Sequence, residues 1–350
     1  MRTTQTIVAR VAAALLIAVT ATAHAGKGFF MNDTIELPEM RTHCIGRYQI
    51  DLPEEFVMTK GSYMALYYGL DKNFQKVEIQ NHRQRGDSPS LERLVGAEKS
   101  ALVNDEHFRS PSKNMLAAVK EVNRDAYLVE SYISARDVDS LKLHLFAQRG
   151  EAIARLQNKK YSDDIEPRPL SFFESQLTRI ANNTRYVATP EQAGRSSCLG
   201  TLAIDDKQDG EVYSVYFISE KHPDVSIHID MNSLTEKGDG GLLARVSGKA
   251  GLLRALDFSS KPLRKGKRQM AGRPGEELLD SGKQDGKVQR YFVAETLITE
   301  PSNLNRPVIA INMSVGGLQD KQTNAYLDPS LTEKESIAWW DAIVDSLRAR

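Results

Sequence analysis

The chain lacks most sequence features that indicate catalysis or a bound cofactor. It has only two cysteines, Cys44 and Cys198, in 350 residues, and they do not form a Cys-x-x-Cys pair. Gly-x-Ser-x-Gly, His-Glu-x-x-His, Walker and Gly-x-Gly-x-x-Gly sequences are all missing. The usual hydrolase nucleophile, zinc site and phosphate-binding loops are therefore absent. We expect no enzymatic activity, no cofactor and no metal.

Excess charge of either sign is also absent. The 46 Lys and Arg residues balance 46 Asp and Glu residues, and the pI is about 7.1. Nucleic-acid binders and binders of anionic membranes depend on surplus Lys and Arg, so we expect neither kind of partner. Hydrophobic residues make up 41% of the chain and charged residues 26%, which is typical of globular domains.

The only long hydrophobic run lies near the N-terminus. Arg2 and Arg10 precede the apolar residues 11–21, and Ala23-His24-Ala25 is a small-x-small cleavage site. This pattern predicts a secretory signal peptide over residues 1–25, cleaved after Ala25, and a periplasmic protein with no stable membrane insertion. The alternative is an uncleaved anchor, for which the apolar run is short. The periplasm is oxidising, so a Cys44–Cys198 disulfide is expected, with two buried independent thiols as the alternative.

A repeated motif organises the mature chain. Cys44-x-Gly46-x-x-x-Ile50-Asp51 returns as Cys198-x-Gly200-x-x-x-Ile204-Asp205. The repeat predicts a duplicated scaffold with an N-terminal α+β domain at 26–188, a linker at 189–197 and a C-terminal α+β domain at 198–350. The linker contains Pro190, Gly194 and Ser196, as an exposed domain boundary often does.

Hydrophobic periodicity gives both halves the order β-β-β-α-β-β-α. In the first half we predict strands at 44–52, 63–68, 74–80, 126–134 and 141–148, with helices after Ser90 and from Pro169. In the second half we predict strands at 198–205, 211–219, 225–231, 288–298 and 307–315, with helices at 241–256 and after Thr332. This order favours antiparallel-rich α+β domains with helices on one sheet face.

Candidate contact residues are few. An acidic segment contains Asp163, Asp164 and Glu166, and a basic run at 261–268 contains Arg264 and Lys265. Either segment can be a solvated loop or a partner contact. Trp340 fits the apolar stripe of the last helix, whereas Trp339 is either core-edge packing or an exposed anchor.

One pair of side chains comes closest to a metal site. His228 and Asp230 share a strand face, but two ligands make a poor metal site, so we expect a solvated face.

Three segments resemble one known family. The start of the mature chain has Cys44, Gly46, Arg47, Tyr48, Asp51, Leu52 and Pro53. Ala271-Gly272-x-x-Gly275-Glu276-Glu277 and the segment from Trp340 to Arg348 follow in the second half. Together they resemble periplasmic immunity proteins that neutralise type VI secretion lipase effectors, namely those cognate to the fourth lipase-effector family.

The resemblance implies a non-catalytic inhibitor. In that family two similar α+β domains form a claw that grips the effector and keeps its active site from opening to lipid. The implied partner is a cognate lipase or phospholipase effector, bound by a monomer in a 1:1 heterodimer. The alternatives are a periplasmic scaffold or binding module without a toxin partner, and a hydrolase with a convergent site.

Overall fold

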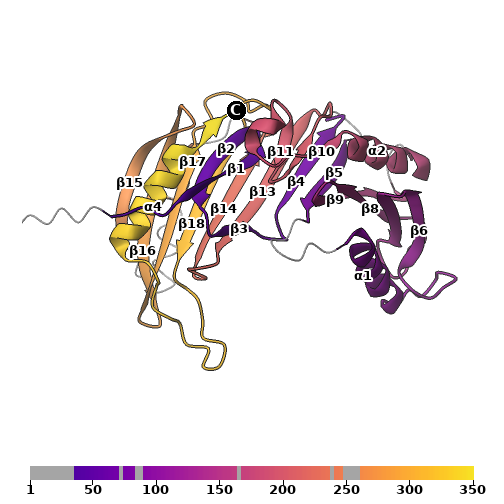
Figure 1. Ribbon diagram of the computed structural model, residues 1–350, viewed down its shortest axis with the longest axis horizontal. Coiled ribbons are helices and arrows are strands. Elements are labelled where there is room, and N and C mark those ends of the chain that lie inside the picture. Colours follow the sequence, from indigo (N-terminus) through magenta and orange to yellow (C-terminus); the bar gives the residue numbers. More distant parts are fainter. Residues whose placement is uncertain (1–34, 71–73, 83–89, 164–166, 237–239, 247–260) are drawn as a thin grey trace, which may run out of the picture. The chain divides into compact units, whose positions relative to one another are not determined.

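Two antiparallel sheets make up most of the protein. The computed structural model describes residues 35–70, 74–82, 90–163, 167–236, 240–246 and 261–350, so the predicted signal peptide lies outside the described residues. The smaller sheet has six strands in the order β10-β12-β11-β1-β2-β19 (Figure 1). They are β1 (Met40–Gly46), β2 (Tyr48–Pro53), β10 (Thr184–Tyr186), β11 (Ser197–Leu199), β12 (Leu202–Ile204) and β19 (Arg348–Ala349).

The larger sheet runs through both halves of the sequence in the order β15-β16-β17-β18-β14-β13-β4-β5-β9-β8-β7-β6, with the short β3 (Phe56–Met58) paired to β13. Its first-half strands are β4 (Tyr63–Tyr68), β5 (Gln75–Asn81), β6 (Leu116–Asn123), β7 (Ala126–Tyr132), β8 (Leu141–Arg149) and β9 (Ala152–Lys160). Its second-half strands are β13 (Gly210–Ser219), β14 (Val225–Asn232), β15 (Lys261–Met270), β16 (Arg273–Gln284), β17 (Lys287–Thr296) and β18 (Val308–Val315).

The strand orders show that the fold is an internal duplication. Reading outward from its centre, the larger sheet has β4-β5-β9-β8-β7-β6 on one side and β13-β14-β18-β17-β16-β15 on the other, which is the same order in each half. The smaller sheet likewise reads β1-β2-β19 and β11-β12-β10 from its centre. The two halves therefore share one topology, and they meet where β1 pairs with β11 and β4 pairs with β13.

The helices cover different faces of the larger sheet. Helices α2 (Leu170–Asn182) and α4 (Glu333–Ser346) lie with the smaller sheet on one face, which we call the inner face, and contribute to the main core. Helix α1 (Leu91–Asn104) packs on the opposite, outer face against Val129, Phe146 and Ile153. Residues 242–246 are also helical and reach outer-face carboxylates, since Leu243 N–H donates to Glu276 (2.9 Å). The prediction that all helices share one face was wrong.

The repeated Cys-x-Gly motif forms a hairpin in each half. Ile45 pairs with Tyr48, and Leu199 pairs with Leu202, so each turn has two residues. The first is a glycine with φ +59° in both turns, Gly46 and Gly200. Two-residue hairpin turns require positive φ, which glycine adopts without a Cβ clash. The single strands predicted at 44–52 and 198–205 were therefore wrong, because the motif reverses the chain.

Other predicted elements agree more closely with the structure. The strand at 63–68 and the hairpin of β13 and β14 are confirmed. Ser90 caps α1 by accepting from Arg93 N–H, and Thr332 and Glu335 form the predicted capping box of α4. The helix predicted at 241–256 lies partly outside the described residues. Strands β6, β9, β15 and β16 were not predicted, and the basic run at 261–268 lies in β15.

The described strands and helices belong to one compact unit, residues 36–350. None of the described helices has the length and apolar character needed to cross a bilayer.

Candidate partner-binding surface

The outer face of the central strands presents exposed aromatic and aliphatic side chains. Along β13, Tyr213, Val215 and Phe217 point into the core, so their neighbours point outward. Tyr216 is 41% exposed and Ile218 is 42% exposed. Isolated exposed apolar residues are ordinary, but several on one sheet face indicate an interaction surface.

The strand register places these residues in two adjacent rows. One row runs Ile218, Ser226, Ser314 and Tyr291 across β13, β14, β18 and β17. The next runs Tyr216, His228, Asn312 and Val293 over the same strands. Tyr291 is 46% exposed. The rows combine apolar area with hydrogen-bonding groups, as the centre of a protein interface does.

His228 holds the middle of this surface in a fixed geometry. Its ring stacks on Tyr216 with centroids 3.9 Å apart and an interplanar angle of 4°. Its Nε2 lies 2.8 Å from Ser214 Oγ and 3.1 Å from Asp230 Oδ1. His228 and Asp230 therefore share the half-exposed face opposite Ile227 and Ile229, as predicted. Among the described residues no group of three His, Cys, Asp or Glu side chains is arranged to hold a metal ion.

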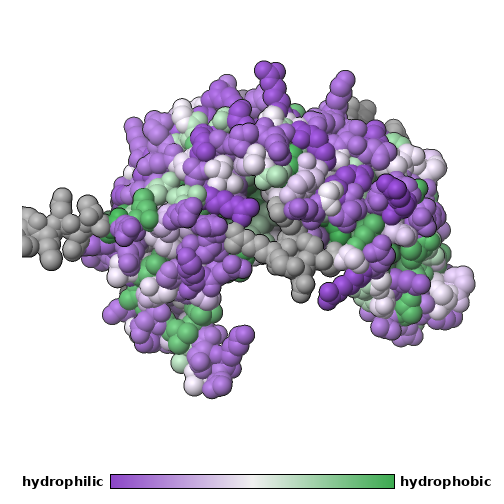
Figure 2. Space-filling view, viewed as in Figure 1, coloured by the Kyte–Doolittle hydropathy of each residue, from purple (hydrophilic) through white to green (hydrophobic). Residues whose placement is uncertain are grey.

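A long loop borders this surface beside β17. Residues 316–330, which we call the finger loop, extend beyond the strand ends as the yellow loop below β16 (Figure 1). Leu318 and Leu327 are exposed on it, and their backbones are joined by a 2.9 Å hydrogen bond. Most of the surface in Figure 2 is hydrophilic, and hydrophobic residues occur at the lower left, where Figure 1 places this loop.

One carboxylate fastens both ends of the finger loop. Asp224 Oδ2 accepts from Gly316 N–H (3.1 Å) and Ser330 N–H (2.9 Å), and Oδ1 accepts from Ser330 Oγ (2.5 Å). Lys287 of β17 also pairs with Asp328 at 2.6 Å. These contacts order the loop before any partner arrives, which lowers the entropy lost on binding.

Helix α1 borders the outer face on the other side and is held by a polar network. His144 Nδ1 lies 2.6 Å from Glu98 Oε1, and Arg155 lies 3.2 Å from the same oxygen. The hydrogen bond with His144, together with nearby positive charge, lowers the pKa of Glu98 to about 2. Burial lowers the pKa of His144. The ionised carboxylate therefore anchors α1 to β8 and β9 at neutral pH.

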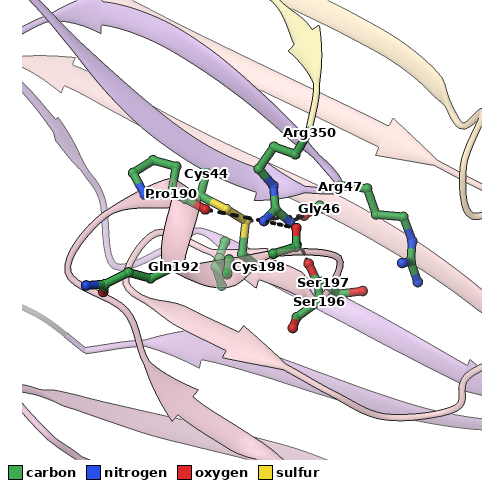
Figure 3. The surroundings of a disulfide bond; sticks show 12 residues. Cys44, Gly46, Arg47, Pro190, Gln192, Ser196, Ser197, Cys198 and Arg350 are labelled. Atoms are coloured by element: carbon green, nitrogen blue, oxygen red, sulfur yellow. Dashed lines mark hydrogen bonds between the residues drawn. A yellow bond between two sulfur atoms is a disulfide. The ribbon is translucent and has the colours of Figure 1, made fainter.

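A disulfide fixes the junction of the two halves. Cys44 of β1 and Cys198 of β11 are bonded, with Cα atoms 5.8 Å apart, and both are buried (Figure 3). The guanidinium of Arg350 lies beside the bond and donates to the carbonyls of Gly46 (2.8 Å) and Ser196 (2.5 Å). The predicted pairing is confirmed, and it cross-links strands that lie at the centre of the smaller sheet.

The residues proposed from sequence as partner contacts are not gathered in one place. Asp163 is exposed in the connection between β9 and α2, while Asp164 and Glu166 lie outside the described residues. Lys265 is exposed on β15. Arg264 is tied to Asp341 (2.5 Å) and Glu277 (2.8 Å) instead of standing free.

Trp339 is 6% exposed and packs edge-on against Phe56, with centroids 6.3 Å apart. It is therefore core-edge packing and not an exposed anchor, so of the two interpretations the first is correct. The outer-face residues were missed because their strands were recognised by the buried positions. The alternation of β13 and β14 contained the signal, since every outward position on these strands was predictable from it.

The protein is a duplicated two-sheet α+β fold. Its candidate site is an exposed surface made by the outer face of the central strands and the finger loop. Residues 188–350 match the model of the Tle cognate immunity protein 4 C-terminal domain, and the resemblance noted in the sequence is confirmed. No protein with curated annotation matches the chain.

Solved structures of immunity proteins share the whole fold. A chain in the crystal structure of the Tle4–Tli4 complex is 22% identical with a TM-score of 0.62, and the match covers 89% of this chain and 97% of that one. The apo immunity protein TplEi of the type VI secretion system of Pseudomonas aeruginosa matches with 22% identity, a TM-score of 0.59 and coverage of 89% and 97%. The structure of the same protein complexed with "L" peptide is 20% identical with a TM-score of 0.58, and the match covers 89% of this chain and 98% of that one.

Proposed function

We propose that this chain is an immunity protein that binds and inhibits a cognate type VI secretion lipase or phospholipase effector. It acts in the periplasm and protects the producing cell and its kin. The observation that carries the proposal is the agreement of the family match at 188–350 with immunity-protein folds that cover nine-tenths of the chain. The signal-like segment 1–25 supports periplasmic placement.

The outer face of the central strands and the finger loop are the proposed contact surface. Both combine exposed apolar groups with fixed hydrogen-bonding neighbours, which suits a protein partner. Asp163 and Lys265 remain proposed peripheral contacts, because exposed charges raise association rates and set partner choice. The domain division at 189–197 and the claw arrangement are proposed with them.

The proposed inhibition requires binding alone and no catalytic group from this chain. An enzyme that hydrolyses lipid must uncover an apolar entrance to admit acyl chains, and such covers move on binding. A rigid surface that holds the cover closed removes activity without touching the effector's nucleophile. The disulfide and the clamped finger loop supply that rigidity here. The chain therefore acts as a non-catalytic, 1:1 inhibitor.

The test is a titration of effector activity. Phospholipid hydrolysis by the lipase encoded beside this protein is measured while the chain starting at Gly26 is added. Loss of activity near equal molar amounts is the expected result. Full activity at large excess contradicts the proposal and favours a periplasmic scaffold without a toxin partner.

A variant pair tests the surface. Tyr216→Ala removes the exposed ring that stacks on His228, and we expect at least tenfold weaker binding of the effector, because central aromatic anchors dominate interface energies. Phe108→Ala is the control, since Phe108 is 52% exposed but lies in the connection after α1. Binding is measured by calorimetry. Equal affinities of both variants and the unchanged chain would remove Tyr216 from the contact.

A further inference from the structure

A groove separates the last strand of the larger sheet from helix α2. Its volume is about 700 Å³, and its lining residues come from β6, β7, α2 and the residue after α2. Figure 1 shows the positions of β6 and α2. The groove is lined by Lys120, Glu121, Val122, Leu128, Glu174, Ser175, Thr178, Arg179, Asn182 and Asn183. Leu128 gives it an apolar floor, and the helix side presents hydroxyl and amide groups. The groove opens on the inner side of the sheet and belongs to no surface described above.

The strand at its rim has a free edge. Among the described strands β6 ends the sheet and pairs with β7 alone, and most of its residues are exposed. Val119 and Val122 are exposed at 39% and 37%. A terminal strand offers unpaired N–H and C=O groups to an added strand. The free edge and the groove therefore form one continuous site.

The duplication shows how the corresponding space is lined in the other half. Buried positions of α2 (Phe173, Gln176, Leu177, Ile180, Ala181) recur with the same spacing in α4 as Ser336, Trp339, Trp340, Ile343 and Val344. Thr178 and Asn182 thus correspond to Asp341 and Asp345. The buried carboxylates Glu130 of β7 and Glu277 of β16 also correspond, which aligns Lys120 with Arg268.

In the second half, ion pairs fill the corresponding space. Arg268 of β15 pairs with Asp341 (2.9 Å) and Asp345 (2.8 Å) of α4, and Arg264 pairs with Asp341. Trp340 adds an indole N–H that donates to Glu277 at 3.1 Å. These contacts bridge strand and helix.

In the first half a single cation bridges strand and helix, at a different position. Lys120 turns toward Glu130 (2.5 Å) and Glu174 (2.6 Å), one helical turn before Thr178. Thr178 and Asn182 are neutral and cannot pair with a cation from β6. Arg179 is occupied by Asp206. The fold does not require this neutral lining, because the corresponding positions carry paired charged side chains in the other half.

We propose that this groove binds a short extended segment of the effector, which adds to the free edge of β6 and places an apolar side chain over Leu128. Backbone hydrogen bonds to β6 supply affinity, and Asn182 and Thr178 supply polar contacts. This inference rests on the proposed function and names a second contact on the partner.

The shape of β6 favours a short partner segment over a second copy of this chain. The β6–β7 register shifts between Leu116 and Ala118 and again between Glu121 and Asn123. Bulges interrupt a ladder and discourage edge-to-edge pairing of two identical sheets. The regular stretch between the shifts, residues 118–121, suits a segment of a few residues.

Amide hydrogen exchange tests the site directly. Exchange at residues 116–123 is measured for the chain from Gly26, alone and saturated with effector. We expect at least tenfold slower exchange in the complex, because an added strand protects edge amides. Exchange at these amides that is unchanged in a fully inhibited complex overturns the groove proposal and leaves the proposed function intact. Absence of any binding overturns both.

A closing variant provides the second test. Lys120→Arg with Thr178→Asp installs the pair that Arg268 and Asp341 form in the other half. We expect it to fold, to lose the protection at 116–123 and to bind effector at least tenfold more weakly. Ser171→Asp is the matched control, since it adds the same charge to an exposed position of α2 outside the groove.

Overlapping peptides of the effector identify the occupant. We expect the unchanged chain and the control to capture one peptide that the closing variant does not. Capture of the same peptide by all three chains overturns the proposal. Protection at 116–123 that grows with the concentration of this chain alone also overturns it, because the occupant is then a second copy.

Discussion

Removing the disulfide is expected to cost a large part of the protein's stability. The bond joins positions separated by 154 residues, so it shortens the unfolded chain substantially. The chain-entropy relation gives about 5 kcal/mol for a loop of that length. Measured losses for native disulfides are about 2–5 kcal/mol, so we expect about 3–5 kcal/mol here.

The variant is Cys44→Ala with Cys198→Ala. Alanine is chosen because both cysteines lie in a small buried cluster with Val187, Ala193 and Ala203. Burial of a serine hydroxyl in this apolar cluster would be unfavourable. Urea unfolding is followed by tryptophan fluorescence, since Trp339 and Trp340 are both buried. Removal of the cross-link also expands the unfolded chain, so the m-value rises.

The control is the unchanged chain unfolded in strong reductant. If the cross-link causes the difference in stability, the reduced unchanged chain should have the same free energy of unfolding as the variant. The variant itself should be insensitive to reductant. A loss below about 1 kcal/mol with an unchanged m-value would refute the reasoning, because the unfolded chain would then not be constrained by the bond. In cells, the same loss should shorten the lifetime of the protein and weaken protection.

Three further predictions concern pH, the finger loop and the hairpin turn. Burial lowers the pKa of His82 to about 4, so only the unfolded chain binds this proton between about pH 6.5 and pH 4. Stability should therefore fall by about 2–3 kcal/mol from pH 7 to pH 4.5, and urea titrations of His82→Asn should show a smaller fall. Asp224→Ala removes the clamp of the finger loop, so amides of residues 316–330 should exchange at least tenfold faster with little change in Tm; equal rates would argue against the clamp. Gly46→Ala should cost about 1–2 kcal/mol in urea unfolding, because its φ is +59°, whereas Gly266→Ala, which has open space, should be nearly neutral.

The amphipathic elements of the fold were predictable, and the reason is periodicity. Val225–Asn232 and the two capped helices have apolar residues at regular spacing, and Tyr63–Tyr68 is a continuous apolar run rich in aromatics. Each was found within a residue or two. The Cys-x-Gly turn was not found, since glycine inside an apolar run does not reveal its φ. The repeat itself indicated duplication, but the register that joins both halves in one sheet depends on long-range pairing.

Strand β15 shows why charge misled the sequence interpretation. Lys261–Met270 contains five Lys or Arg residues, which suggested a solvated loop. Its inward-facing arginines are neutralised by Asp341, Asp345 and Glu277, residues distant in sequence. Only the packing of α4 on β15 makes a strand of this composition stable. The candidate surface was missed for a related reason, because an exposed face has no composition that distinguishes it from ordinary solvated positions.

The duplication distinguishes residues that the fold requires from residues that are available for binding a partner. Both halves keep a glycine with positive φ, a buried carboxylate at Glu130 or Glu277, and an arginine pairing with the repeated aspartate, Arg348 with Asp51 and Arg185 with Asp205. These features serve the architecture, because they recur in both halves although the surrounding residues differ.

Two differences between the halves lie outside this shared set. The connection before α4, residues 316–332, is almost twice as long as its counterpart before α2, residues 161–169. Two arginines bridge β15 to α4, whereas Lys120 alone bridges β6 to α2 and a groove lies beside it. Since one half folds without a long finger loop and the other without the neutral groove lining, neither feature is required by the topology. Both are therefore positions where binding can diversify at little cost to stability, and an immunity protein that must match one effector needs such positions.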